Sequence, residues 1–381
     1  MIPTNSKLRL NNWTLLGLLA LLVVGVASCD DDNGPGPMGP DTDLIVGPAE
    51  ATPYLLEVND FMPALPSANL IELSEEGIEL GRRLFYDPIL SNDSTMSCST
   101  CHQQERAFTD GLATSPGVLG QRGSRNAMSL VNLVYNDQGF FWDGRSPTLA
   151  EQAIHPVEDM LELNSDWDEV LSRIRATADY PTRFRAAFGI DRKSEITRDL
   201  VTRAIAQFET TIISDNTRFD RYTYLLSDLP TSDEIDGAEL FFIEFATPDQ
   251  VHPGCSHCHN KPRFSNNRFF NNGLENVANL EDFPDRGHGQ VTDNVFDNGK
   301  FRTPTLRNIA LTAPYMHDGR FATLEEVLDH YASGGHAIEN RDPNITGFEL
   351  SEEDKRILLA FLESLTDDEL ISDPRFSNPF E

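Results

Sequence analysis

The sequence predicts a mainly α-helical protein with two similar modules and long irregular loops. Three observations lead to this prediction. Apolar residues recur with the period of an amphipathic helix in several segments, and no long stretch alternates apolar and polar residues as a half-buried strand would. The motif C-x-x-C-H occurs twice, at 98–102 and 255–259. A repeated motif on a helical background indicates a repeated helical unit.

Composition narrows the class of protein. The 381 residues are enough for two domains, and 39% hydrophobic residues are enough for packed cores. Acidic residues number 61 against 30 basic ones, for a formal net charge of −31. This charge argues against binding nucleic acid or docking on an anionic membrane, because both need a basic face. It favours a partner with a basic face.

The first residues have the pattern of an export signal. Lys7 and Arg9 precede an apolar run at 15–26, and the run ends in the sequence VASC at 26–29. We expect 1–28 to be a lipoprotein signal peptide and Cys29 to carry the lipid. An uncleaved signal-anchor helix is the alternative, but the run is shorter than the ~20 apolar residues of a membrane span. The prediction is a periplasmic or cell-surface lipoprotein whose lipid on the outer membrane is its only membrane contact.

A tether and then a helical body follow. Residues 29–50 are rich in Gly, Pro and Asp and predict a flexible acidic tether. Helix starts are expected where a capping residue precedes an apolar period. These starts are Ser74 before 75–85, Thr323 with Glu326 before 324–331, and Ser351 before 352–365, with further apolar stripes at 167–174 and 200–212. Loops are expected at 215–235 and 266–300.

A weak repeat accompanies the two motifs. GIEL at 77–80 lies 21 residues before Cys98, and GAEL at 237–240 lies 18 residues before Cys255. A Phe follows each motif, at Phe108 and Phe264. We therefore expect an N-terminal domain at 51–230 and a C-terminal domain at 231–381.

The two C-x-x-C-H motifs predict covalent haem c. In this motif the two thiols bond to the haem vinyl groups and the adjacent His ligates the iron. The attaching residues would be Cys98 and Cys101 with His102, and Cys255 and Cys258 with His259. A zinc site and a redox dithiol are the alternatives. Zinc does not require His directly after each second Cys, and a thioredoxin-like motif would occur once in a βαβ context.

The second ligand of each iron decides between electron transfer and catalysis, because an open side can bind peroxide. Met316 and Tyr331 are candidates in the C-terminal half. Tyr331 shares the apolar face of its helix with Leu324, Val327 and Leu328. The period alone favours a core tyrosine over an iron ligand.

Longer motifs resemble one family. They are LFYDPILS at 84–91, CSTCH followed by AFTDG at 107–111, FFWDGR at 140–145 and TPTLRNIALTAPYMHDGRFATLEEV at 303–327. In these motifs the chain, from about 70 to 366, resembles the bacterial di-haem cytochrome c peroxidases and their relative, the methylamine utilisation protein MauG. The resemblance implies two cytochrome c-like domains, an N-terminal peroxidatic haem and a C-terminal haem that receives electrons from a donor.

The resemblance also implies roles for individual residues. Trp142 matches the Trp between the haems, and Gln152 and Glu162 match the distal-pocket pair, with Glu162 as acid and base. A calcium site between the domains is implied as well, formed by the side chain of Asn126 and the backbone carbonyls of Thr312 and Pro314. Members are often dimers, but these residues indicate no dimer face, so a homodimer stays open.

Two positions depart from many members of the family. A distal His is common sixteen residues after the first motif's His, where this chain has Val118. We therefore expect the N-terminal haem to be open without prior reduction. The usual Met ligand of the C-terminal haem aligns with Tyr331, as in MauG-like members, so the resemblance favours Tyr331 over Met316. A phenolate stabilises ferric iron more than a thioether does and lowers the reduction potential.

The predicted function is the reduction of hydrogen peroxide to water with electrons from a cytochrome c or another small redox protein. One alternative is a MauG-like oxidase that modifies Trp or Tyr residues of a partner protein. Another is a non-catalytic di-haem electron carrier, against which Val118, Gln152 and Glu162 argue.

Overall fold

A computed structural model describes residues 41–67, 71–243 and 253–381. The predicted signal peptide at 1–28, the lipidated Cys29 and the tether up to residue 40 lie outside the described residues. The expected mainly α-helical class is confirmed, because in the described part helices alternate with irregular segments and two-residue strands. The helices are α1 (Glu75–Tyr86), α2 (Cys98–Cys101), α3 (Leu149–Gln152), α4 (Ile154–Glu158), α5 (Trp167–Ala176), α6 (Tyr180–Phe188), α7 (Arg198–Thr210), α8 (Arg218–Thr223), α9 (Ser232–Phe242), α10 (Gly289–Thr292), α11 (Leu324–Ser333) and α12 (Glu352–Glu363).

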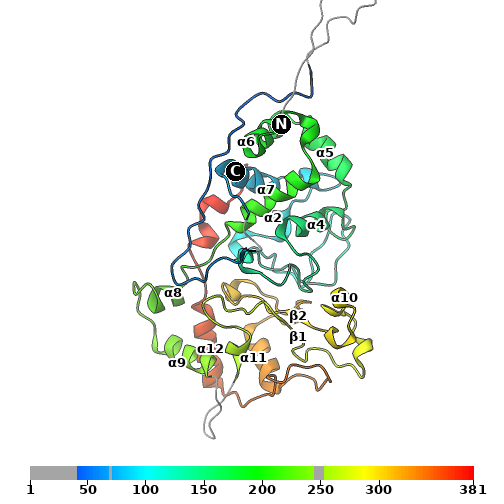
Figure 1. Cartoon of the computed structure of the whole chain (residues 1–381). Coiled ribbons are helices and arrows are strands. Elements are labelled where there is room, and N and C mark those ends of the chain that lie inside the picture. The colour runs from blue at the N-terminus through cyan, green and yellow to red at the C-terminus, as the bar shows by residue number, and fades with distance from the viewer. Residues whose placement is uncertain (1–40, 68–70, 244–252) are drawn as a thin grey trace, which may run out of the picture. The chain divides into compact units, whose positions relative to one another are not determined.

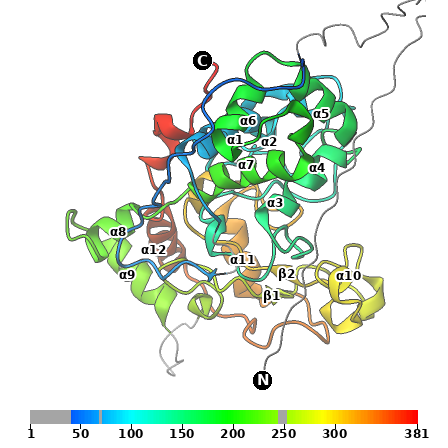
Figure 2. The ribbon, with the colours of Figure 1, turned by 45° about the horizontal axis from the view of Figure 1, so that its top comes forward.

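The strands β1 (Phe269–Phe270) and β2 (Phe301–Arg302) form one antiparallel pair. Phe269 lies opposite Arg302, and Phe270 lies opposite Phe301. The pair therefore joins two segments that are distant in sequence, as Figures 1 and 2 show.

The predicted helix starts at Ser74, Thr323 and Ser351 are confirmed. Each side-chain oxygen accepts a hydrogen bond from a backbone N–H of the first turn, and Thr323 and Ser351 form capping boxes with Glu326 and Asp354. The predicted loop at 215–235 is wrong in part, since it contains α8 and the start of α9. Capping boxes at Thr217 and Thr231 stabilise these two helix starts. The predicted loop at 266–300 likewise contains β1 and α10.

Helix pairs form the cores. Buried residues of α1, α5, α6 and α7 make one hydrophobic cluster, and buried residues of α8, α9, α11 and α12 make another. In Figure 1 the first group lies in the upper part of the ribbon and the second in the lower part. Each group packs beside one of the C-x-x-C-H motifs, because Cys98 contacts a cluster with Phe85 and Phe208, and Cys255 contacts the cluster with Phe361.

The crossing of α1 with α7 and the crossing of α9 with α12 have the same geometry. The residues that correspond between them differ from those expected from the sequence repeat. A Cβ at Gly81 of α1 would lie 1.9 Å from the carbonyl oxygen of Ala204 in α7. A Cβ at Gly237 of α9 would lie 2.0 Å from the carbonyl oxygen of Ile357 in α12. Gly81, not Gly77 of GIEL, is thus the counterpart of Gly237. The close approach of the two backbones needs a glycine at this position. The structural repeat therefore pairs GRRLF at 81–85 with GAELF at 237–241, and not GIEL with GAEL.

The hydrophobic clusters cross the expected domain boundary at 230/231, which stays a prediction. Phe219 of α8 packs with Phe241 and Phe361, so α8 joins the C-terminal group. The C-terminal end returns to the N-terminal group, where Phe376 packs with Phe85 and Phe108. The C label in Figure 1 accordingly lies near α6 and α7.

Part of the expected tether packs on the helical body. Ile45 is buried, and its N–H donates to the carbonyl of Asp191. The Asp43 carboxylate accepts hydrogen bonds from the backbone N–H and hydroxyl of Ser194. Residues 43–45 are therefore held by the 191–194 segment. Within the described ranges, no helix has the length and apolar character needed to cross a membrane.

Candidate functional site

The first C-x-x-C-H motif forms a single helical turn with its imidazole fixed. Cys98–Cys101 make α2, and His102 ends it. The Nδ1 of His102 lies 2.8 Å from the carbonyl oxygen of Phe108, which is in the left-handed region with φ 62°. A carbonyl only accepts, so Nδ1 carries the proton and Nε2 keeps its lone pair. This is the second contact that orients an iron-ligating His.

The second motif repeats this geometry. A short 3₁₀ turn at Cys255–His257 precedes Cys258 and His259. The Nδ1 of His259 donates to the carbonyl of Phe264 at 3.0 Å, and Phe264 has φ 53°. The Phe that follows each motif is thus the acceptor for its His. Burial lowers the pKa of His259 to about 4 and lowers that of His102 as well, so both rings are neutral at pH 7.

The four thiols are in the chemical state that suits covalent attachment. All four cysteines are free. Burial raises the pKa of Cys101 to about 11 and the pKa values of Cys255 and Cys258 to about 12, and it raises that of Cys98 further. A redox dithiol is activated by a lowered thiol pKa. The site therefore does not favour redox dithiol chemistry.

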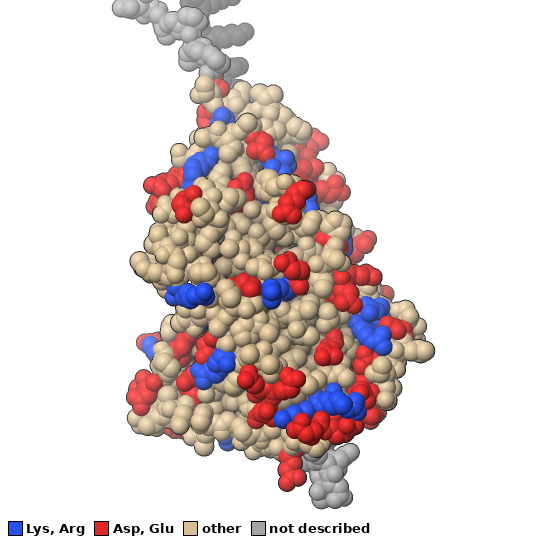
Figure 3. All heavy atoms as spheres, turned by 180° about the vertical axis from the view of Figure 1, so that it is seen from behind, with Lys and Arg blue, Asp and Glu red and all other residues tan. Residues whose placement is uncertain are grey.

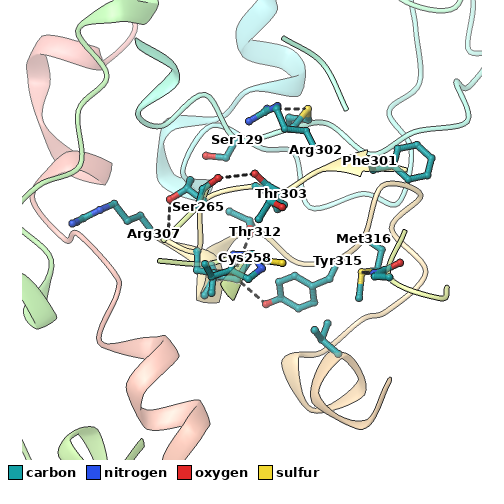
Figure 4. A pocket seen from close by; sticks show the side chains of 18 of the residues that line it. Ser129, Cys258, Ser265, Phe301, Arg302, Thr303, Arg307, Thr312, Tyr315 and Met316 are labelled. Carbon is teal, nitrogen blue, oxygen red and sulfur yellow. Dashed lines mark hydrogen bonds between the residues drawn. The ribbon is translucent and has the colours of Figure 1, made fainter. Parts of the chain in front are cut away.

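A cavity lies beside the second motif, as Figure 4 shows. Cys255, Cys258 and His259 line it together with both candidate second ligands, Met316 and Tyr331. Residues from both halves of the chain line this cavity. These include Asn126, Met128, Trp142, Arg302, Thr312, Pro314 and Leu328.

One amide holds both candidate second ligands. The Nδ2 of Asn272 lies 3.3 Å from the hydroxyl of Tyr331 and 3.5 Å from the sulfur of Met316. Burial raises the pKa of Tyr331 to about 12, so its hydroxyl is protonated at neutral pH in the absence of a metal. Tyr331 and Met316 both line the cavity at the second motif, and the choice between them stays a prediction.

Trp142 and Asn126 come together at the border between the two halves. The indole Nε1 of Trp142 donates to the carbonyl of Asn126 at 3.0 Å, and both line the cavity. The amide of Asn126 donates to the carbonyl of Leu112 at 2.7 Å, which leaves its Oδ1 as the acceptor of that side chain. Thr312 and Pro314 line the same cavity. The three expected calcium ligands thus surround one space, and the ion itself stays a prediction.

Glu162 lies in a turn that contacts the loop of Val118. The backbone N–H of Val118 donates to the carbonyl of Glu162 at 2.8 Å. Desolvation, followed by the charge of Asp159, raises the pKa of Glu162 to about 7, and Arg145 lowers it slightly. Glu162 is exposed to solvent, and the nearby protein still removes part of the hydration of its carboxyl group. Its charge also acts on Cys98 and Cys101, so it lies near the first motif.

Gln152 is the last residue of α3, and α4 separates it from the Glu162 turn. It is partly buried. Its neighbour Ala153 and Val157 of α4 pack into the N-terminal core, which anchors the segment between the two expected distal residues.

Three polar residues of these sites were not expected from the sequence. Asn272 orients the candidate ligands, as described above. Glu209 is 5% exposed, its Oε2 has no hydrogen-bond partner among the described residues, and burial raises its pKa to about 8. Its charge acts on Cys98. Arg302 is 4% exposed and lines the cavity.

A cluster of Glu275, His317 and Asp318 has the spacing of metal ligands. Arg320 pairs with both carboxylates and lies 2.6 Å from Asp318. The guanidinium takes the position of the cation, so we assign this cluster to an ion-pair network.

The residues present fit covalent haem at both motifs. Each motif has two protonated thiols and a neutral imidazole whose Nδ1 is already bonded, and the cavity at the second motif carries an oxygen or sulfur ligand candidate. Each feature is what haem c attachment and two-sided iron ligation require.

Comparisons with known proteins agree with this chemistry. Residues 75–226 match the family described as di-haem cytochrome c peroxidase. The chain is 35% identical over 300 residues to the methylamine utilization protein MauG of Methylorubrum extorquens, covering 79% of this chain and 80% of that one. It is 33% identical over 326 residues to the cytochrome c551 peroxidase of Nitrosomonas europaea, covering 86% and 90%.

Solved structures give the same fold. A MauG-like protein associated with microbial copper homeostasis matches with a TM-score of 0.76 and 36% identity, covering 86% of this chain and 100% of that one. The diheme peroxidase BthA from Burkholderia thailandensis matches with a TM-score of 0.67 at 22% identity, covering 88% and 96%. At that identity the second likeness concerns the fold alone.

Proposed function

Because the chain belongs to the di-haem cytochrome c peroxidase family and is therefore a haem-dependent oxidoreductase, we propose that it reduces hydrogen peroxide to water with electrons from a small redox protein. The observation that carries the proposal is Glu162. This carboxyl group acts electrostatically on both thiols of the first motif and has a pKa of about 7. A group with that pKa can both accept and return a proton at neutral pH.

The cofactors are two haems c, and bound haem supplies an iron that takes peroxide and a second centre that takes an electron. Cys98, Cys101 and His102 would hold one haem. Cys255, Cys258 and His259 would hold the other. The bonds from the two imidazoles to Phe108 and Phe264 keep each Nε2 directed away from the backbone.

Glu162 would move the proton. Its carboxylate accepts a proton from one oxygen of hydrogen peroxide and returns it to the other oxygen, which leaves as water. Gln152 would hold the peroxide by hydrogen bonds, as an amide near developing charge does. Overall, one peroxide consumes two electrons and two protons and yields two waters.

We further propose that the enzyme needs no prior reduction. Many relatives place a His at the position of Val118, whose side chain has no iron ligand to offer. The peroxidatic haem would then be open in the fully oxidised protein. Trp142 would carry electrons between the haems, and Tyr331 rather than Met316 would be the second ligand of the C-terminal haem.

The donor would have a basic face. The net charge is −31, and the face in Figure 3 shows acidic side chains over both its upper and lower parts. Such a charge accelerates association with a basic cytochrome and makes the rate depend on salt. Calcium bound by Asn126, Thr312 and Pro314 and a lipid on Cys29 in the outer membrane complete the proposal, and the homodimer stays open.

A second candidate function is oxidation of Trp or Tyr residues in a partner protein. The 35% identity to MauG and the TM-score of 0.76 to a MauG-like protein favour it. A tyrosine ligand at Tyr331 would also favour it, because a low reduction potential hinders reduction by an ordinary cytochrome.

One experiment separates these candidates. Ferric protein is mixed with hydrogen peroxide and then with reduced cytochrome c. Rapid oxidation of the cytochrome supports the peroxidase. A peroxide-induced spectrum that persists in the presence of the cytochrome supports the protein-modifying oxidase. Failure of azide or cyanide to bind the ferric protein would instead support a di-haem electron carrier.

A further inference from the structure

Arg302 is a buried cation whose hydrogen-bond partners among the described residues are all neutral. Its Nη1 donates to Oδ1 of Asn136 at 3.1 Å, and its Nε donates to the carbonyl of Phe141 at 3.3 Å. Its Nη2 lies 3.8 Å from the sulfur of Met128. Among the residues that the structure describes, no carboxylate forms an ion pair with it. Burial alone lowers its pKa to about 10.

The same segment contains a buried arginine that has its counter-charge. Arg307, 1% exposed, contacts both oxygens of Asp220 at 2.6 and 2.9 Å. A buried charge without a partner is costly, and buried charges are normally paired. Among the described residues, the fold supplies an anion for Arg307 and none for Arg302. A bound group is therefore the candidate for the anion that pairs with Arg302.

The position of Arg302 identifies that anion. Arg302 lines the cavity that Cys255, Cys258 and His259 also line, and Figure 4 shows it above Cys258. A haem bonded through its vinyl groups to two cysteines carries its two propionate carboxylates on the edge away from them. A guanidinium matches a carboxylate with two parallel hydrogen bonds.

We propose that Arg302 forms an ion pair with a propionate of the haem attached to Cys255 and Cys258, and that this pair positions the haem edge against Trp142. The backbone of Arg302 already contacts this segment, because its N–H donates to the carbonyl of Trp142 at 2.8 Å. The pair thus joins the C-terminal haem to the border that electrons would cross. The inference rests on haem binding at the second motif and assigns Arg302 a positioning role.

The test is the midpoint potential of the haems in Arg302→Met, measured at pH 7, where the propionate is ionised and Arg302 keeps its charge. Loss of the positive charge favours ferric iron, so the potential of the C-terminal haem should fall. We expect the equilibrium constant for its reduction to fall about tenfold, or ~59 mV for one electron. Arg302→Lys keeps the charge and should keep the potential. It loses the planar fork, so the propionate-bending band in the resonance Raman spectrum should shift.

Arg268→Met is the matched control. Arg268 is exposed, and its carbonyl accepts from Thr303 next to Arg302, so the control removes one charge from the neighbouring strand segment. Potentials in Arg302→Met that equal those in Arg268→Met would overturn the inference. If Arg302→Met does not fold, an unchanged propionate band in Arg302→Lys would overturn it equally. Haem content is measured first, because a wild-type protein without haem at the second motif would contradict the proposed function instead.

Discussion

The backbone N–H of Val118 donates to the carbonyl of Glu162 at 2.8 Å. This bond fixes the loop in which many relatives carry a distal His against the turn that carries the proposed acid and base. A Cβ at the neighbouring Gly117 would lie 2.1 Å from the carbonyl oxygen of Leu161, so the two segments pack backbone against backbone. The contact holds the backbone of residue 118 beside the backbone of Glu162, whatever side chain residue 118 has.

Val118→His should close the peroxidatic site, because the imidazole would supply the iron ligand that Val118 lacks. We expect a larger low-spin fraction in the ferric spectrum, and we expect the ferric protein to react with peroxide at least about tenfold more slowly. The control is Leu119→His on the exposed neighbour. Equal spectra for the two variants would show that the loop does not face the first motif.

Glu162→Gln should slow peroxide cleavage by about 100-fold or more, because an amide cannot accept the proton. Both haems should stay bound, which pyridine haemochrome spectra would verify. Glu158→Gln, an exposed carboxylate four residues earlier, is the matched control. Stopped-flow rates that are the same for both variants would remove Glu162 from the mechanism.

The rate of the peroxide reaction should rise with pH around pH 7. Burial raises the pKa of Glu162 to about 7, so the carboxylate that accepts the proton is present above this pH and lost below it. A profile of kcat/KM for peroxide would show this ionisation in the wild type, and Glu162→Gln should lack it. An identical ionisation in the variant would assign it to another group.

The second iron ligand can be assigned by comparing Tyr331→Phe with Met316→Leu. Tyr331→Phe should change the spectrum of one low-spin haem and raise its potential, because it removes the phenolic oxygen. Met316→Leu should leave both nearly unchanged. The reverse pattern would make Met316 the ligand. The two side chains share Asn272, so each variant serves as the control for the other.

Glu209 should make the folded protein less stable as pH rises. Burial raises its pKa from 4.5 to about 8, so the folded state holds a proton that the unfolded state has released across this interval. The cost grows to the order of 3 kcal/mol by pH 7. Glu209→Gln should flatten the decline in melting temperature between pH 4.5 and pH 8. An equal decline in both proteins would show that Glu209 ionises normally.

The sequence predicts those parts of the fold whose signals are local. The starts of α1, α11 and α12 follow from Ser74, Thr323 and Ser351 because a cap depends on three or four adjacent residues. The expected repeat paired GIEL with GAEL because their residue types are alike. Which glycine meets the partner helix depends on Ala204 and Ile357, which lie far along the chain.

Site residues divide in the same way. The attaching cysteines and histidines follow from their spacing. The repeated position of Phe108 and Phe264 was visible in the sequence, but the hydrogen bond that each backbone carbonyl accepts from its His was not. Asn272 could not be predicted, because its contact with Tyr331 spans 59 residues. Arg302 could not be predicted either, since its significance lies in its burial and in the absence of an acidic partner among the described residues.

The central claim is that the fully oxidised protein already has an open peroxidatic site. Diferric protein, without any reductant, is mixed with one equivalent of hydrogen peroxide in a stopped-flow spectrometer, and reduced cytochrome c is added afterwards. The account predicts an immediate change in the haem spectrum that cytochrome c then reverses rapidly. A protein that stays unchanged until one haem has been reduced would contradict it, because another ligand would then have to take the place of the missing His at Val118.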